Sequence, residues 1–162
     1  MDKKELQKRA ATYCKLSGTR LIPNPALGHG TDGSVWRSTG KTAVKAFYYE
    51  KNYHDELECY KRLQNAEITQ IKELAVPALE GSSLEFLVVE MSIVQPPYLL
   101  DFGKVYIDRP PPYASDAQCM SNWHAEVRDL FEDRASEVYN VLHILKKLGI
   151  HYVDPKPANI CF

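Results

Sequence analysis

Half of the prolines in this chain are concentrated in one stretch. Of the ten prolines in 162 residues, five lie between Val94 and Ser115. Because proline fixes φ and removes a backbone hydrogen-bond donor, this stretch predicts a long, stiff connection rather than a regular element. Six apolar residues between Leu99 and Ile107 are too many for a free linker, so we expect the connection to pack on the body of the protein.

The part before the connection changes its periodicity several times. Helical spacing predicts a helix over residues 3–16, ended by a glycine. Glycines then separate runs of β-forming residues, which predict strands at 34–36 and 42–49. A second helix is expected over 52–65 and a buried strand over 84–94. The expected inner face of the first helix is Leu6, Ala10, Tyr13 and Leu16.

The part after the connection is mainly helical. Apolar residues at helical spacing predict helices over 117–131 and 133–148, the second ended by Gly149, and residues 159–162 look like the start of a buried strand. The expected inner faces are Trp123, Val127 and Leu130, then Val138, Val141, Leu142, Leu145 and Leu148. The pattern predicts a single α+β domain over 1–162, with a β-rich half to about residue 92, the connection over about 93–116 and a small helical half over 117–162.

Composition excludes several classes of protein. A formal net charge of -1 gives no attraction to nucleic acid or to an anionic membrane. The four cysteines are far apart and form no Cys-x-x-Cys pair, which argues against a zinc site. We expect neither a signal peptide nor a membrane span, because no apolar stretch approaches about 20 residues. A reduced, cytoplasmic location is expected.

Three glycines, Gly28, Gly30 and Gly33, precede the strand at 34–36. Glycines let a backbone turn approach phosphates, but this pattern alone also fits an ordinary hairpin. A strand rather than a helix follows the third glycine, which favours a phosphate-binding flap over a dinucleotide fold. Lys45 lies on the next strand, on the same face as Ala43, and apolar neighbours make a solvent-facing lysine a poor alternative.

A second segment carries the residue types that phosphoryl transfer uses. Asp154, Lys156 and Asn159 lie within one loop stiffened by two prolines. A carboxylate can orient the acceptor hydroxyl, an ammonium can contact the moving phosphate, and an amide oxygen can bind a metal ion. The loop therefore predicts a phosphoryl-transfer site.

These segments occur in an order that resembles the protein-kinase signature set. The glycine segment, Lys45, the helix with Glu56, the strand ending at Ser92 and the loop with residues 154–159 follow one another over residues 25–162. The chain is similar to small bacterial kinase-like proteins. The resemblance implies a minimal kinase-like fold that binds ATP and Mg²⁺: an antiparallel sheet with one helix of the αC type, and a short, mainly helical C-terminal lobe.

The resemblance also implies roles for individual residues. Gly28, Gly30 and Gly33 would cover the phosphates, and Val35 and Ala43 would line the adenine. Lys45 would contact the α- and β-phosphates and pair with Glu56, with Glu58 as the competing choice. Val89 would be the gatekeeper, and the backbone of Glu90 and Ser92 would hold the adenine edge. Asp154 would orient the acceptor, Lys156 would steady the γ-phosphate and Asn159 would bind Mg²⁺.

The chain also departs from that family. Tyr152 and Val153 stand where the kinase catalytic loop has histidine and, often, arginine. The family's Asp-Phe-Gly is expected about a dozen residues after Asn159, beyond Phe162. An Asp-Phe-Gly is present at 101–103, before the catalytic loop. It is either a coincidence in an apolar loop or a second source of a metal ligand, with Asp101 folding back to the site.

Two functions follow from these expectations. One is an ATP-dependent phosphotransferase acting on a hydroxyl of a protein or small molecule. The other is a pseudokinase, an interaction module with little or no catalysis. Beyond the nucleotide, the resemblance implies that a protein partner or a second protomer could complete the reduced helical half. A glycine-rich protein unrelated to ATP remains the third interpretation.

Overall fold

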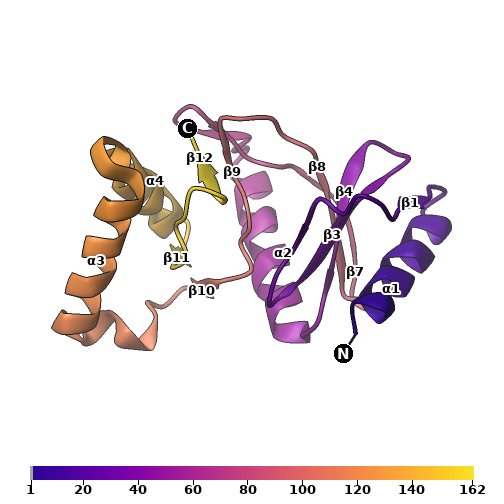
Figure 1. The fold of residues 1–162 in the computed structure, drawn as a ribbon, viewed down its shortest axis with the longest axis horizontal. Helices are drawn as coiled ribbons and strands as arrows, with labels where there is room; N and C mark the ends of the chain where they lie inside the picture. The colour runs from indigo at the N-terminus through magenta and orange to yellow at the C-terminus, as the bar shows by residue number, and fades with distance from the viewer. Residues whose placement is uncertain (1) are drawn as a thin grey trace.

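The computed structural model describes residues 2–162 and shows an α+β protein with an antiparallel sheet at one end and two helices at the other (Figure 1). Helix α2 (Glu50–Asn65) and the proline-rich connection lie between these ends. No helix within residues 2–162 has both the length and the apolar character needed to cross a membrane.

The main sheet has the order β1-β3-β4-β8-β7, with β2 also paired to β3. Every pair in it is antiparallel. Its strands are β1 (Leu21–Ile22), β2 (Gly28–His29), β3 (Gly33–Ser38), β4 (Thr42–Phe47), β7 (Leu79–Ser83) and β8 (Val88–Ser92). Lys45 lies opposite Val35 on one side and Val89 on the other. Because strand side chains alternate, Lys45 points to one face while Trp36 and Val44 point to the opposite face.

Helix α1 (Lys3–Leu16) packs on that opposite face, as Figure 1 shows beside β3, β4 and β7. It starts at the Asp2 cap and is followed by Gly18 at φ 76°, in agreement with the predicted helix end. Its inner face is Leu6, Ala10, Tyr13 and Cys14. The expected contribution of Leu16 is wrong: this side chain is 72% exposed. Relative to Leu6, the buried Ala10 and Cys14 lie about 40° and 80° round the helix in one direction, whereas Leu16 lies about 80° in the other, off the buried face.

Helix α2 packs on the face that carries Lys45, with Tyr60 and Leu63 buried in the main core. The strand expected over 84–94 is shorter than predicted. β8 covers Val88–Ser92, and Leu84, 53% exposed, lies in the turn that joins it to β7. β7 was not predicted, because its sequence Leu-Glu-Gly-Ser-Ser has few β-forming residues.

The connection packs on the body, as expected, with Leu99, Phe102 and Val105 buried. Contrary to the prediction it contains regular elements. β9 (Tyr98–Leu99) pairs with β12 (Ile160–Cys161) and with β6 (Leu74–Ala75), which in turn pairs with β5 (Gln70–Ile71). β10 (Val105–Ile107) pairs with β11 (Ile150–Tyr152), and a short 3-10 helix η1 (Pro112–Ser115) follows. The connection therefore contributes one strand to each of two small sheets.

The helical end consists of α3 (Ala117–Phe131), the 3-10 turn η2 (Glu132–Arg134) and α4 (Ala135–Lys147). Both predicted helices are confirmed, and so is the end of the second at Gly149, which has φ 73°. Leu130 is exposed and Phe131 is buried in its place, because Phe131 lies four residues after the buried Val127, on the same face of α3. Leu142 and Leu148 are only partly buried.

Candidate functional site

A cavity of about 680 Å³ lies between the main sheet, α2 and the connection. Its volume is in the range of about 300–1,000 Å³ that small-molecule sites occupy. Residues 27–35, strand β4, the end of β8, residues 100–104 and residues 156–159 all contribute to its lining. Segments far apart in the sequence therefore meet around one cavity, which we call the pocket.

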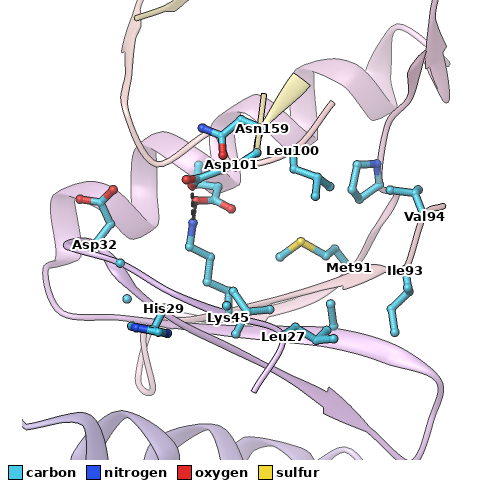
Figure 2. Close-up of a pocket in the computed structure, with 18 of the residues that line it drawn as sticks. Leu27, His29, Asp32, Lys45, Met91, Ile93, Val94, Leu100, Asp101 and Asn159 are labelled. Atoms are coloured by element: carbon cyan, nitrogen blue, oxygen red, sulfur yellow. Dashed lines mark hydrogen bonds and ion pairs between the residues drawn. The ribbon is translucent and has the colours of Figure 1, made fainter. Parts of the chain in front are cut away.

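The pocket has an apolar side and a charged side, which Figure 2 shows facing each other. Leu27, Met91, Ile93 and Leu100 line the apolar side. On the charged side, Lys45 rises from β4 toward Asp101, with Asn159 beside it. Such a division suits a ligand with a flat apolar part and an anionic part.

Lys45 lies between two carboxylates. Its Nζ is 2.5 Å from Glu56 Oε2 and 2.8 Å from Asp101 Oδ1. Glu58 instead pairs with Arg62 at 2.9 Å, so the predicted partner Glu56 is confirmed over its competitor. Burial disfavours the Lys45 ammonium, but the two carboxylates outweigh it and hold the pKa of Lys45 above its ordinary value.

The two carboxylates differ in their surroundings. Glu56 is fully buried on α2, and burial raises its pKa to about 7. Asp101 is partly open to the pocket, and Lys45 overcomes the effect of burial and lowers the pKa of Asp101. At neutral pH, Asp101 is therefore the ionised carboxylate that faces the pocket.

Aromatic packing fixes the segment that carries Asp101. The Phe102 ring packs edge-on between Tyr60 of α2, with ring centroids 5.3 Å apart, and Tyr152 of β11, at 5.8 Å. The Tyr152 hydroxyl donates to the carbonyl of Leu100 at 2.8 Å. Asp101 itself has φ 58°, a left-handed conformation that aspartate adopts more readily than most residues. Packing and hydrogen bonds thus hold the Asp-Phe-Gly segment in a fixed position at the pocket.

The glycine segment covers the pocket as a flap formed by β2, β3 and the turn between them. Gly28, Gly30 and Gly33 all line the pocket. A side chain at Gly33 would collide with the Ala46 carbonyl, so glycine is required there for close approach to β4. The Gly30 amide donates to the Gly33 carbonyl at 2.9 Å and is used within the flap.

Asn52 of α2 connects the flap to the Asp-Phe-Gly segment. Its Nδ2 donates to Asp32 Oδ1 at 3.1 Å and to the Gly103 carbonyl at 3.2 Å. Asp32 is at the tip of the flap and faces the charged side of the pocket (Figure 2). One amide therefore holds three segments together at this end of the pocket.

The loop after β11 supplies the predicted catalytic residues. Asp154 Oδ2 accepts from Lys156 Nζ at 3.0 Å and from Lys104 Nζ at 3.1 Å. Burial opposes ionisation of Asp154, but the hydrogen bonds from Lys156 and Lys104 lower its pKa. Asn159 is buried, and its Nδ2 donates to the Asp154 carbonyl at 3.2 Å. That bond directs the amide oxygen of Asn159 toward Asp101, as Figure 2 shows.

Asp101 and Asn159 offer a carboxylate and an amide oxygen to the same part of the pocket. Within residues 2–162, no group of three or more His, Cys, Asp or Glu side chains is placed to hold a metal ion. A metal at this place would therefore have few protein ligands. Mg²⁺ is commonly bound in that way, with phosphate oxygens and water completing its coordination.

The expected adenine edge must be corrected. Glu90 does not line the pocket: its carboxylate accepts from Tyr13 at 2.9 Å and from Thr42, on the α1 side of the sheet. Its backbone lies between β4 and β7. Ser92 does line the pocket, but its amide donates to the Ala78 carbonyl at 2.9 Å. Residues 93–95 are the ones that continue the rim.

The expected gatekeeper is also displaced. Val89 is fully buried and is not part of the pocket lining, whereas Met91 is. In the register of β4 and β8, Met91 lies opposite Ala43 and Val89 lies opposite Lys45. The sequence interpretation placed this rim two residues too early, because an apolar run alone does not show its register.

Lys104 was not singled out from the sequence. It lines the pocket from the connection, directly after the Asp-Phe-Gly segment. The sequence did contain a signal for it, since Lys104 is the only charged residue between Phe102 and Ile107.

Comparison of the chain with protein-family models, curated proteins and solved structures found no match.

Proposed function

We propose that this protein has a kinase-like fold, binds ATP with Mg²⁺ in the pocket and transfers the γ-phosphate to a hydroxyl acceptor. The observation that carries the proposal is the arrangement around Lys45. A buried ammonium between Glu56 and Asp101 lies at the charged end of a cavity whose other side is apolar. ATP has matching parts, a flat base and a chain of phosphates.

The nucleotide would enter with its base on the apolar side. Ala43 and Val35 share the face that lines this side, and Met91 and Leu100 lie across it. The phosphates would then extend below the flap to Lys45. An ammonium that is buried and permanently charged stabilises such an anion more strongly than a surface lysine does.

Asp101 and Asn159 are the residues that would hold Mg²⁺. Bound Mg²⁺ would neutralise part of the charge that phosphoryl transfer develops. Asp101 is prepared for this task, because Lys45 keeps its carboxylate ionised. Here the Asp-Phe-Gly segment reaches the pocket from a position before the catalytic loop in the chain.

Asp154 would orient the acceptor. Its pKa is lowered by two lysines, so at neutral pH it is an ionised hydrogen-bond acceptor rather than a strong base. In the transfer, the acceptor oxygen bonds to the γ-phosphorus and the bond to the β–γ bridging oxygen breaks. The electron pair stays with ADP, and the hydroxyl proton passes to Asp154 and then to water. Lys156 would accompany the moving phosphate.

A pseudokinase is the second candidate, and one observation favours it. The charged groups of the pocket already satisfy one another: Lys45 is paired with Glu56 and Asp101, and Asp154 with Lys104 and Lys156. Charged groups that pair with one another need no ligand to neutralise them, so this arrangement also suits an interaction module.

The substitution Asp154→Ala separates the two candidates. For the enzyme, we expect transfer of labelled γ-phosphate to fall by roughly a hundredfold or more, because the acceptor loses its hydrogen-bond partner. ATP affinity, measured by calorimetry with Mg²⁺, should change by less than about threefold, because Asp154 does not line the pocket.

Asp129→Ala, at an exposed position of α3, is the matched control and should leave both quantities unchanged. Transfer that survives Asp154→Ala would refute the enzyme assignment. Binding of ATP without transfer to water or to the protein itself would favour the pseudokinase. Absence of ATP binding would refute both.

A further inference from the structure

Two lysines converge on a single carboxylate oxygen at the catalytic loop. Lys104 Nζ is 3.1 Å and Lys156 Nζ is 3.0 Å from Asp154 Oδ2. The group carries one net positive charge. The side chains are partly open, with exposed fractions of 46% for Lys104, 41% for Lys156 and 28% for Asp154. An anion can therefore approach both ammonium groups without entering the core.

The two lysines come from different segments that the fold holds together. Lys156 is on the loop after β11, and Lys104 directly precedes β10, which pairs with β11. The Val153 amide donates to the Lys104 carbonyl at 3.4 Å, so the lysine backbone is fixed beside the catalytic loop. The position of Lys104 is thus set by the fold, and its side chain reaches the pocket from the outer side.

Lys45 lies at the other end of the charged side, paired with Glu56 and Asp101, whereas Lys104 and Lys156 are both paired with Asp154. In the proposed function, Lys45 and Lys156 already serve the phosphates of the nucleotide. A hydroxyl that donates to the Asp154 carboxylate would, in contrast, lie close to Lys104, because the Lys104 ammonium is bound to Oδ2 of that carboxylate. An anionic group a few bonds from that hydroxyl would pair with the Lys104 ammonium.

Aromatic side chains border the same place. Trp123 Nε1 donates to the Val153 carbonyl at 3.3 Å, next to Asp154. Tyr113 of η1 lies close enough that, after burial and the neighbouring Tyr106, the charge of Asp154 contributes to raising the Tyr113 pKa. The Trp123 ring is therefore held beside the loop that carries Asp154.

From these contacts we propose that Lys104 binds an anionic group of the acceptor, and that the acceptor is a small hydroxyl compound with a phosphate or a carboxylate. The inference rests on the proposed function, because it concerns the second substrate of the same site. It assigns Lys104 to acceptor specificity and leaves the nucleotide to Lys45 and the flap.

The test measures binding of a matched series to protein saturated with a non-hydrolysable ATP analogue and Mg²⁺. Glycerol phosphate, glycerate and glycerol share hydroxyl groups and differ in their anionic group. We expect saturable calorimetric binding of glycerol phosphate, of glycerate, or of both, and none of glycerol at the same concentration. Comparison of glycerol phosphate with glycerate shows whether the site prefers a phosphate or a carboxylate.

The substitution Lys104→Met should weaken that binding by about tenfold or more, the effect of losing one charge-assisted hydrogen bond, while the affinity for the ATP analogue stays within about threefold. Lys104→Arg should retain most of the binding, and Lys147→Met on the exposed end of α4 should retain all of it. Raising the salt concentration should reduce it.

Three results would overturn the inference. They are equal binding of glycerol and its anionic relatives, unchanged binding of the anions by Lys104→Met, and an equal loss of ATP-analogue affinity in that variant, which would assign Lys104 to the nucleotide. Nucleotide binding without anion binding rejects only the acceptor class. Failure of the analogue to bind the wild-type protein rejects the proposed function as well.

Discussion

Lys45, Glu56 and Asp101 together carry one excess negative charge when both carboxylates are ionised. One ammonium lies between two carboxylates, and Glu56 is the fully buried one of the two. Burial disfavours the ionised form of Glu56 and raises its pKa, so Glu56 takes up a proton before Asp101 does as the pH falls. Asp101 keeps its charge because it is nearer the pocket and shares the same ammonium.

The pH dependence of stability should reveal this proton. Burial raises the Glu56 pKa from 4.5 in the unfolded chain to about 7 in the fold. The folded state therefore binds the proton more tightly, and the associated stability is fully present below the unfolded pKa and lost as the pH rises through about 7. The slope contributed by one proton is at most about 1.4 kcal/mol per pH unit. We expect the free energy of unfolding without Mg²⁺ to show this fall relative to Glu56→Gln.

The comparison between variants is essential, because other groups titrate in the same range. Burial lowers the pKa of His151, which contributes stability of the opposite sign as the pH rises. Subtracting the urea-unfolding curve of Glu56→Gln removes that contribution. Glu58→Gln, on the outer side of the same helix, should keep the wild-type slope. Parallel curves for wild type and Glu56→Gln would contradict the assignment.

At the scale of elements, the connection is a packed part of the structure between the main sheet and the helical end. It carries Asp101 and Lys104 to the pocket and contributes a strand to each of the two small sheets. Phe102 is the residue that joins α2 to β11, because its ring packs against Tyr60 and Tyr152. The placement of Asp101 therefore depends on an aromatic contact and not only on its own ion pair.

Phe102→Leu tests this dependence. Replacing a buried ring by a smaller apolar side chain should cost roughly 1–2 kcal/mol of unfolding free energy. It should also loosen Asp101, so the gain in ATP affinity on adding Mg²⁺ should fall by several-fold. Phe86→Leu, which packs against the core on the α1 side, is the matched control and should leave the Mg²⁺ effect unchanged. Equal effects of both substitutions would show that Phe102 acts only through stability.

The elements that the sequence predicted well are those with strong local periodicity. Helices α1 and α3 have the predicted bounds, and strand β4 with its inward Lys45 follows from alternation alone. β7 was missed because its pairing with β8, and not its own composition, makes it a strand. Phe131 was missed because Leu130 also fits the helical spacing from Val127. The backbone of Glu90 was expected at the rim of the pocket, but Glu90 is not part of the lining. The pairing of β8 with β4 places Met91 opposite Ala43, and no local pattern contains that register.

The candidate site could be predicted only in part for a related reason. Lys45, Glu56 and Asn159 were identified from motif spacing, and the pairing of the first two is confirmed. The return of Asp101 to the site as a metal ligand could only be raised as an alternative, and its ion pair with Lys45 was not predicted, since both depend on how the connection folds back. Lys104 was missed because its partner, Asp154, is 50 residues away.

At the scale of the whole molecule, the pocket lies between the main sheet and the segments that lead to the helical end. Figure 1 shows the sheet and α1 at one end and α3 and α4 at the other. Away from the pocket, Arg62 at the end of α2 joins them, donating to Asp108 at 2.6 and 2.7 Å and to the Leu148 carbonyl at 3.0 Å. Asp108 is largely exposed, so this pair contributes little free energy by itself.

A ligand that fills the pocket should therefore stabilise both ends together. A ligand that binds only the folded state stabilises it by about 2.7 kcal/mol at a hundredfold excess over its Kd. We expect ATP with Mg²⁺ to raise the unfolding free energy by that amount, and to slow amide hydrogen exchange in β8 and residues 93–95 as well as in residues 156–160. Lys45→Met should abolish both effects at the same ATP concentration, whereas Lys147→Met should not. Protection confined to the sheet end would mean that the nucleotide binds the flap and β4 without contacting Lys156 and Asn159, and the phosphoryl-transfer geometry would then be wrong even though ATP binds.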